Sequence, residues 1–176
     1  MPQQDDTYYL GRAVELAREA MLAGDAPFGS VLVNAAGDII HEDRNRTVTG
    51  ESGDGRADAT LHPEFTIARW AQQNLGPEER AACTVYTSGE HCPMCAAAHA
   101  YCGLGPIAYA ASSSLYAAWQ EEHGFVGHAV AALPINQVAP NIKVRGPYEA
   151  LSDEVKKIHV ERWEKQKAAK AGSKQT

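Results

Sequence analysis

The sequence lacks any long apolar run. No stretch of its 176 residues approaches the roughly 20 consecutive apolar residues that a helix needs to cross a bilayer. The N-terminal segment MPQQDDTYYLGRA also lacks the positive region and the apolar core of a secretory signal. We therefore expect a soluble, cytoplasmic protein that does not work at a membrane.

The sequence also has fewer positively than negatively charged residues. Sixteen Lys and Arg residues stand against twenty-two Asp and Glu residues, which gives a net charge of −6. A protein that binds nucleic acid usually carries a basic face, so this balance argues against a nucleic-acid partner. The basic residues that do cluster lie in a C-terminal tail whose composition indicates a frayed, solvated end, and they are Lys165, Lys167, Lys170 and Lys174.

Cysteine is scarce, with four residues in the chain. Without a secretory signal, four cysteines are more typical of reduced thiols or metal ligands than of a disulfide framework. The chain is long enough for one compact domain and too short for two ordinary ones, and no repeat or linker divides it. We therefore expect a single domain over residues 1–176, ordered over about 7–168, with flexible tails.

Residue patterns predict helices and strands that alternate along most of the chain. Helices between the later strands favour right-handed crossovers and a mixed sheet that is covered on both faces. Residues 44–60 and 123–140 are left as long connections, and the second is a candidate cover for a pocket. The expected helices are 7–23, 63–75, 94–102, 112–122 and 148–167, and the expected strands are 30–34, 38–43, 82–88, 106–111 and 142–144.

Two short motifs, HPE from His62 and CPMC from Cys92, stand at the starts of two expected helices. A helix N-terminus carries partial positive charge that stabilises a thiolate, and Cys92 and Cys95 lie one turn apart on one helix face. Two thiolates and the imidazole of His62 are a usual ligand set for zinc, and three protein ligands leave the fourth position to water. Glu64 can reach that position as a general acid or base without binding the metal.

Each motif alone has other interpretations. A CxxC motif after a strand and before a helix is also typical of a thioredoxin-type thiol–disulfide protein, but that interpretation leaves His62 and Glu64 without a role. A zinc ribbon needs a second close cysteine pair, whereas Cys83 and Cys102 are far apart in sequence and are expected in the core. The two motifs together favour a catalytic zinc site.

These segments resemble the cytidine/deoxycytidylate deaminase superfamily, in particular its branch of guanine and cytosine deaminases and tRNA adenosine deaminases. HPE and CPMC match the signature of zinc nucleobase deaminases, H-x-E followed by P-C-x-x-C, except that His91 replaces the proline. The segments APFGSVLV from Ala26, DATLHPE from Asp58 and TVYTSGEHCPMC from Thr84 are similar to further family segments. The resemblance covers most of the chain and implies a three-layer α/β/α sandwich with a five-stranded mixed sheet.

The resemblance also implies a reaction and a metal. His62, Cys92 and Cys95 would bind Zn²⁺, and Glu64 would carry protons during the hydrolytic deamination of a nucleobase or nucleoside. A water activated by zinc would attack the carbon that bears the amine, and ammonia would leave. Family members are usually dimeric or larger, so we expect a homodimer.

Five residues are hypotheses for substrate contacts. By resemblance, Asn45 would hydrogen-bond the edge of the base and Phe28 would pack against it. Leu61 stands where the family has alanine and would narrow the pocket, and His91 would add a titratable group at the rim of the metal site. Trp119 is a candidate for a second aromatic wall, although its helical spacing favours a place in the core.

The net acidity favours a small substrate over tRNA. We rank guanine or a related aminopurine first, cytosine-type and isocytosine-type bases second, and tRNA adenosine third. A non-enzymatic alternative is a deaminase-like scaffold whose zinc is structural or whose pocket is blocked by Leu61 and His91, and the intact Glu64 argues against it.

Overall fold

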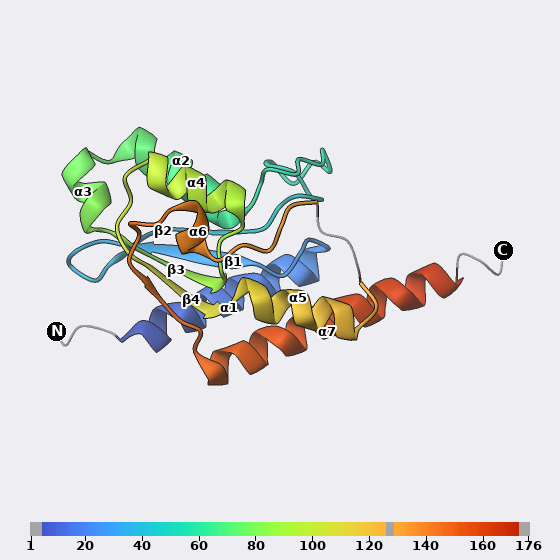
Figure 1. The fold of residues 1–176 in the computed structure, drawn as a ribbon. Coiled ribbons are helices and arrows are strands. Elements are labelled where there is room, and N and C mark those ends of the chain that lie inside the picture. The colour runs from blue at the N-terminus through green and yellow to red at the C-terminus, as the bar shows by residue number, and fades with distance from the viewer. Residues whose placement is uncertain (1–4, 126–128, 173–176) are drawn as a thin grey trace.

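The structure is a computed structural model that describes residues 5–125 and 129–172. Five strands form one mixed sheet with helices on both faces (Figure 1). The predicted three-layer α/β/α sandwich with a five-stranded mixed sheet is therefore confirmed. In their order across the sheet, the strands are β2 (Ile39–Arg44), β1 (Gly29–Val33), β3 (Thr84–Gly89), β4 (Ile107–Ala111) and β5 (Val144–Arg145).

Helices form the two outer layers of the sandwich (Figure 1). They are α1 (Asp6–Ala23), α2 (Pro63–Asn74), α3 (Pro77–Ala82), α4 (Pro93–Tyr101), α5 (Ser113–Glu122), α6 (Ile135–Val138) and α7 (Glu149–Gly172). On one face α1 packs on β1 and β3, and α7 packs on β4 and on α1; on the other face α2 packs against α4 and β1. Side chains of β1 alternate between these layers, since Val31 belongs to the core under α1 and α7 whereas Leu32 belongs to the core under α2.

The directions of the strands determine where the helices begin. β1 pairs antiparallel with both β2 and β3, whereas β3, β4 and β5 run parallel. Parallel neighbours need crossovers, which α4 provides between β3 and β4, and α5 and α6 provide between β4 and β5. Because β3 and β4 end at the same edge of the sheet, the starts of α4 and α5 lie together there, and open α/β sheets commonly bind ligands at such an edge.

Several predicted elements differ from the observed ones, among them the last strand, predicted over 142–144 and observed as Val144–Arg145. The expected strand 82–88 begins only at Thr84, because Pro77–Ala82 forms α3, whose start is stabilised by a hydrogen bond from the Gly76 amide to the Glu79 carboxylate at 2.6 Å. The short α6 interrupts the connection 123–140. The last helix, predicted over 148–167, is α7, which continues to Gly172 and so includes Lys170 of the predicted tail. The predicted flexible ends at residues 1–4 and 173–176 lie outside the described residues.

The last helix, α7, is long but amphipathic. Val155, Ile158 and Trp163 are buried against the sheet and α1, while charged side chains cover its other side. Within residues 5–125 and 129–172, no helix combines the length and the apolar character that crossing a membrane would require.

Gly29 marks a close approach of β1 to α1. A Cβ at this position would lie 2.4 Å from the Ala13 carbonyl oxygen and 2.4 Å from Leu16 Cβ. We expect Gly29→Ala to lower the free energy of unfolding by about 3 kcal/mol, because an added methyl forces the helix and the strand apart. Denaturant unfolding measures the change. Gly11→Ala is the matched control, since a Cβ there meets nothing within 4 Å and alanine favours the helix; equal stability of the two variants would contradict the prediction.

Candidate active site

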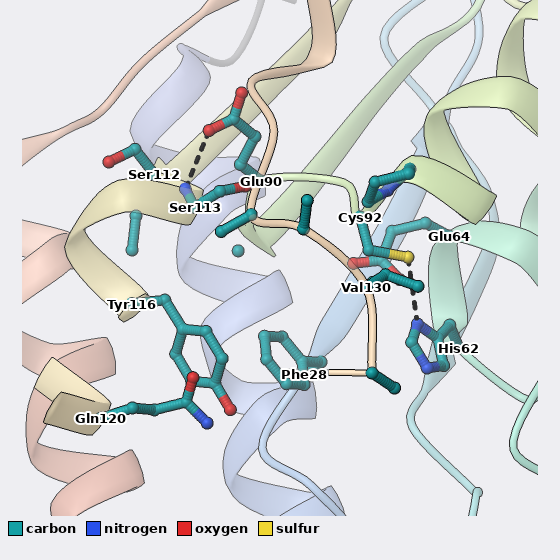
Figure 2. Close-up of a pocket in the computed structure, with 16 residues that line it drawn as sticks. Phe28, His62, Glu64, Glu90, Cys92, Ser112, Ser113, Tyr116, Gln120 and Val130 are labelled. Atoms are coloured by element: carbon teal, nitrogen blue, oxygen red, sulfur yellow. Dashed lines mark hydrogen bonds between the residues drawn. The ribbon is translucent and has the colours of Figure 1, made fainter. Parts of the chain in front are cut away.

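A cavity of about 310 Å³ lies among the residues at this edge of the sheet (Figure 2). Its volume is at the small end of the range of about 300–1,000 Å³ that is typical of small-molecule sites. Residues 129–132 line one side of it, so the connection that was a candidate cover does border a cavity. Residues 126–128 of that connection lie outside the described part of the chain.

Two aromatic rings border the cavity. Phe28, the residue before β1, meets Tyr116 of α5 edge to face, with ring centroids 5.4 Å apart and an interplanar angle of 71°. Gly89 at the end of β3 allows the Phe28 ring to lie close, because a Cβ there would be 2.9 Å from Phe28 Cε1. Behind them His159 of α7 contacts both rings, and burial lowers the pKa of His159 to about 3, so the ring is neutral. The result is an apolar wall of the cavity against which a flat ring can pack.

Trp119, the candidate for a second aromatic wall, lies in the core, as its helical spacing favoured. Trp119 is 7% exposed and belongs to the core cluster under α1 and α7, and it does not line the cavity. Tyr116 lies there instead, with Gln120 one turn further along the same face of α5. Helical spacing alone does not separate these positions, because residues three and four apart are neighbours on the surface of one helix.

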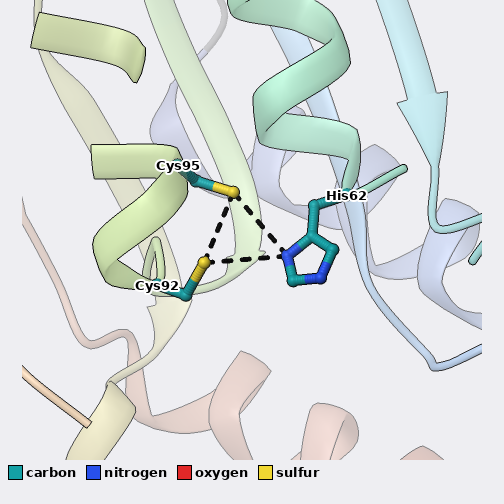
Figure 3. Close-up of side chains that lie close together, drawn as sticks. All are labelled: His62, Cys92 and Cys95. Carbon is teal, nitrogen blue, oxygen red and sulfur yellow. Dashed lines mark hydrogen bonds between the residues drawn. The ribbon is translucent and has the colours of Figure 1, made fainter. Parts of the chain in front are cut away.

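Three side chains meet at one end of the cavity (Figure 3). His62 immediately precedes α2, Cys92 immediately precedes α4, and Cys95 lies in the first turn of α4. The two Sγ atoms are 3.5 Å apart, and His62 Nδ1 is 3.7 Å from each of them. We call these three residues the ligand cluster.

The ligand cluster has the size and chemistry of a zinc site. Tetrahedral zinc, with Zn–S near 2.3 Å and Zn–N near 2.0 Å, holds its ligand atoms roughly 3.5–3.8 Å apart, which matches the observed separations. Two sulfurs and one imidazole nitrogen are donors that suit zinc. Among the described residues, this is the one group of three or more His, Cys, Asp or Glu side chains whose ligand atoms all lie within 4.8 Å.

The three side chains of the ligand cluster differ in how strongly their pKa values are shifted, and in which direction. Hydrogen bonding to Cys95, and then to His62, lowers the pKa of Cys92 to about 4, so this residue is a thiolate at neutral pH. The neighbouring Cys92 and burial raise the pKa of Cys95 well above its usual value, and the Cys92 thiolate raises the pKa of His62. On binding a metal ion, Cys95 would release its proton and become the second thiolate ligand.

Glu64 lies in the first turn of α2 and is only 4% exposed. One carboxyl oxygen accepts a hydrogen bond from the Thr87 hydroxyl at 3.2 Å, and the other lies 3.8 Å from Cys95 Sγ. Burial raises the pKa of Glu64 to about 7. A carboxyl group that titrates near neutral pH and borders the cavity can both accept and return a proton.

Asn45 and Leu61 do not line the cavity. Asn45 is buried, and its Oδ1 accepts hydrogen bonds from the Thr47 amide at 3.1 Å and the Thr47 hydroxyl at 2.8 Å, which hold it within its own turn. Leu61 is 4% exposed, so its side chain is in the protein interior. Successive residues of an extended segment point in different directions, and the next residue, His62, points to the ligand cluster. The structure therefore does not place these two residues at the predicted substrate contacts.

His91 is not at the rim of the site, contrary to the sequence-based hypothesis. Its side chain is wholly buried and meets His99 edge to face, with ring centroids 5.4 Å apart. Burial lowers the pKa of His91 well below its usual value, so it is a neutral ring in the interior. Cys92, the next residue, borders the cavity, whereas His91 does not.

Glu90 joins two parts of the cavity lining. One carboxyl oxygen accepts a hydrogen bond from the Ser113 amide and the other accepts one from the Ile135 amide, each at 2.8 Å. These amides begin α5, which carries Tyr116, and α6, which follows residues 129–132. Its two partners therefore come from two segments that are distant from it in sequence.

Known proteins are similar to this chain in sequence. The sequence profile of the MafB19-like deaminase family matches residues 4–169. Guanine deaminase of Bacillus subtilis (strain 168) is 40% identical over 104 residues, which cover 58% of this chain and 62% of that protein. The tRNA(Ile)-lysidine synthase of Deinococcus radiodurans is 35% identical over 104 residues, which cover 59% of this chain and 17% of that protein. The chain thus spans less than two thirds of the length of either relative.

A solved structure is similar as well. It comes from studies of A-to-I editing by tRNA:A34 deaminases, and it superposes with a TM-score of 0.59 at 27% sequence identity. The match covers 86% of this chain and 99% of that one. The likeness therefore extends over nearly the whole sandwich.

Proposed function

The chain belongs to the MafB19-like deaminase family, and on that premise we propose that it is a zinc-dependent hydrolytic deaminase of a nucleobase or nucleoside. The observation that carries the proposal is the ligand cluster with Glu64 beside it, at one end of a small apolar cavity. Three protein donors would leave one zinc position open for chemistry.

The proposed mechanism assigns one task to each group. His62, Cys92 and Cys95 would hold Zn²⁺, which when bound would supply a water activated for attack on the amine-bearing carbon. Glu64 would take one proton from the attacking water and deliver it to a ring nitrogen. It would then take the second proton, from the newly added hydroxyl group, and deliver it to the amine, which leaves as ammonia; a pKa near 7 suits both transfers. The Thr87 hydroxyl orients one oxygen of Glu64 during these transfers.

For the substrate, we propose guanine or a related aminopurine first. The cavity is small and mostly apolar, the chain is acidic, and the similarity to Bacillus subtilis guanine deaminase supports a purine base. Cytosine-type bases come second. A tRNA adenosine comes third, supported by the similarity to the structure from the tRNA:A34 deaminase studies.

A homodimer is part of the proposal. Ala97, Ala100 and Tyr101 of α4 border a shallow hollow on the surface, and Tyr101 is 92% exposed. Exposed apolar patches of this kind mark contact surfaces in many soluble proteins, and a second copy of the chain would cover this one. Sedimentation velocity of the purified protein tests this, because a monomer mass at micromolar concentration would contradict it.

The proposed function is tested by ammonia release from a panel of bases. The zinc-loaded protein should deaminate guanine with a higher kcat/KM than cytosine, isocytosine, adenine or the corresponding nucleosides. Bound zinc without ammonia release from any compound would favour a non-catalytic scaffold. The low pKa of Cys92 also suits a thiol–disulfide protein, so a metal-free protein that cycles between disulfide and dithiol would refute the deaminase proposal.

A further inference from the structure

Gln120 is a polar residue in the lining of the cavity whose side-chain oxygen is unsatisfied. Its Oε1 is buried and has no hydrogen-bond partner among the described residues. Buried acceptors are nearly always paired in folded proteins, so an unpaired one needs an explanation. In the lining of a binding cavity, the simplest explanation is that a donor on the occupant completes it.

Gln120 lies away from the reacting end of the cavity. In Figure 2, His62 and Cys92 lie on one side of Phe28, and Tyr116 and Gln120 lie on the other. A flat heterocycle beside Phe28, with its amine-bearing carbon near the ligand cluster, therefore turns its opposite edge toward Gln120. The ligand cluster would lie near the reacting carbon, and Gln120 would contact the opposite edge of the substrate.

The Gln120 amide can turn to meet that edge. The last torsion of a glutamine side chain is broad and has a low barrier, and because Oε1 has no partner, turning breaks no hydrogen bond at that atom. After the turn, Oε1 can accept a hydrogen bond from a substrate N–H. Gln120 Oε1, which lacks a hydrogen-bond partner in the free protein, would then have one in the complex.

The opposite edge differs between a free base and a nucleoside. In free cytosine it carries the N1–H, and in a free purine it carries the N–H of the five-membered ring. In a nucleoside the nitrogen of the glycosidic bond bears a sugar in place of hydrogen, so that donor is lost. The added sugar would also need room beside Tyr116.

The space at the Tyr116 end of the cavity is limited. The Tyr116 ring is backed by His159 at 4.8 Å and by Trp163 at 6.0 Å between ring centroids. His159 and Trp163 are both buried in α7, so this side of the cavity cannot widen without disturbing the core. Both the hydrogen bond to Gln120 and the limited space beside Tyr116 therefore favour a free base over a nucleoside.

We propose that Gln120 is a specificity-determining residue that selects free nucleobases over nucleosides by accepting a hydrogen bond from the ring N–H at the edge remote from the reacting carbon. The inference rests on the proposed function, because it assumes that the amine-bearing carbon lies near the ligand cluster. It narrows the substrate class from bases and nucleosides to free bases.

The test compares Gln120→Leu with the native residue on matched pairs, guanine with guanosine and cytosine with cytidine. Leucine keeps similar bulk but cannot accept a hydrogen bond, so kcat/KM for the free base should fall about 10- to 100-fold, while that for the nucleoside changes by less than about threefold. Gln120→Glu keeps an acceptor and should retain more of the base preference than Gln120→Leu. Gln73→Leu, at an exposed position of α2, is the matched control and should change neither value.

Binding provides a readout that does not depend on turnover. In the zinc-loaded Glu64→Gln background, isothermal titration calorimetry should show the free base binding more tightly than the nucleoside, and Gln120→Leu should remove most of that difference. Equal affinity for base and nucleoside, an equal loss for both in Gln120→Leu, or no binding of either would overturn the inference. Selective binding of the base without ammonia release from the native protein would refute the proposed function alone.

Discussion

Glu64→Ala should reduce kcat for deamination by about 10³- to 10⁴-fold while leaving the fold and the zinc content unchanged. The carboxyl group is buried beside the ligand cluster but is not part of it, so its loss removes proton transfer without removing a metal donor. General acid–base catalysis by one positioned side chain is worth up to about 10⁴-fold. Steady-state ammonia release and zinc analysis of the same preparation measure the two quantities together.

Two further variants make the Glu64 test sharper. Glu64→Gln keeps the shape and can still accept the hydrogen bond from Thr87, but it cannot carry a proton, so it should be as inactive as Glu64→Ala. Glu78→Ala removes a carboxylate from the exposed side of α3 and should keep full activity. A Glu64→Ala protein that turns over near the native rate would refute the proton-transfer role.

Removing one sulfur from the ligand cluster should abolish both zinc binding and turnover. Cys95→Ala leaves Cys92 and His62 as the two remaining donors, and bound zinc should fall from about one equivalent to less than about a tenth. Metal analysis after dialysis measures the zinc. Ammonia release should fall below detection, because the activated water is lost together with the metal.

Cys83→Ala is the matched control for the zinc prediction. Cys83 is also a buried cysteine, at 2% exposed, but it packs in the core under α2, and it is not a member of the ligand cluster. This variant should lose some stability and keep its zinc. Full zinc content in Cys95→Ala, or equal zinc loss in both variants, would show that the metal is held elsewhere.

Local signals predicted the elements that carry the chemistry. Pro63 and Pro93 open α2 and α4, as expected for residues that tolerate the first helical position, and they place His62 and Cys92 as the residues before each helix. Runs of β-branched residues likewise predicted β1 within one residue of its observed bounds, and β3 apart from its start. These features depend on residues within a few positions of each other, which is why sequence patterns contain them.

Errors arose where a long-range contact decided the outcome. Trp119 and Tyr116 lie on the same helix, and only the packing of α5 on α7 determines which ring is buried with Trp163 in the core and which borders the cavity. Nothing near Glu90 in sequence indicates that its carboxylate bonds amides 23 and 45 residues away. Neither arrangement could be read from local periodicity.

The sequence by itself determined which donors exist and where each one stands relative to a helix start. HPE and CPMC carry the two thiols, the imidazole and the carboxyl group, because helix-start chemistry is local. Only the tertiary structure decided that His62 and Cys92, thirty positions apart, meet within 3.7 Å, that His91 is buried in the interior, and that Gln120 borders the cavity with an unpaired oxygen. The physical reason is that the sheet, through its parallel and antiparallel pairings, brings distant helix starts together at one edge.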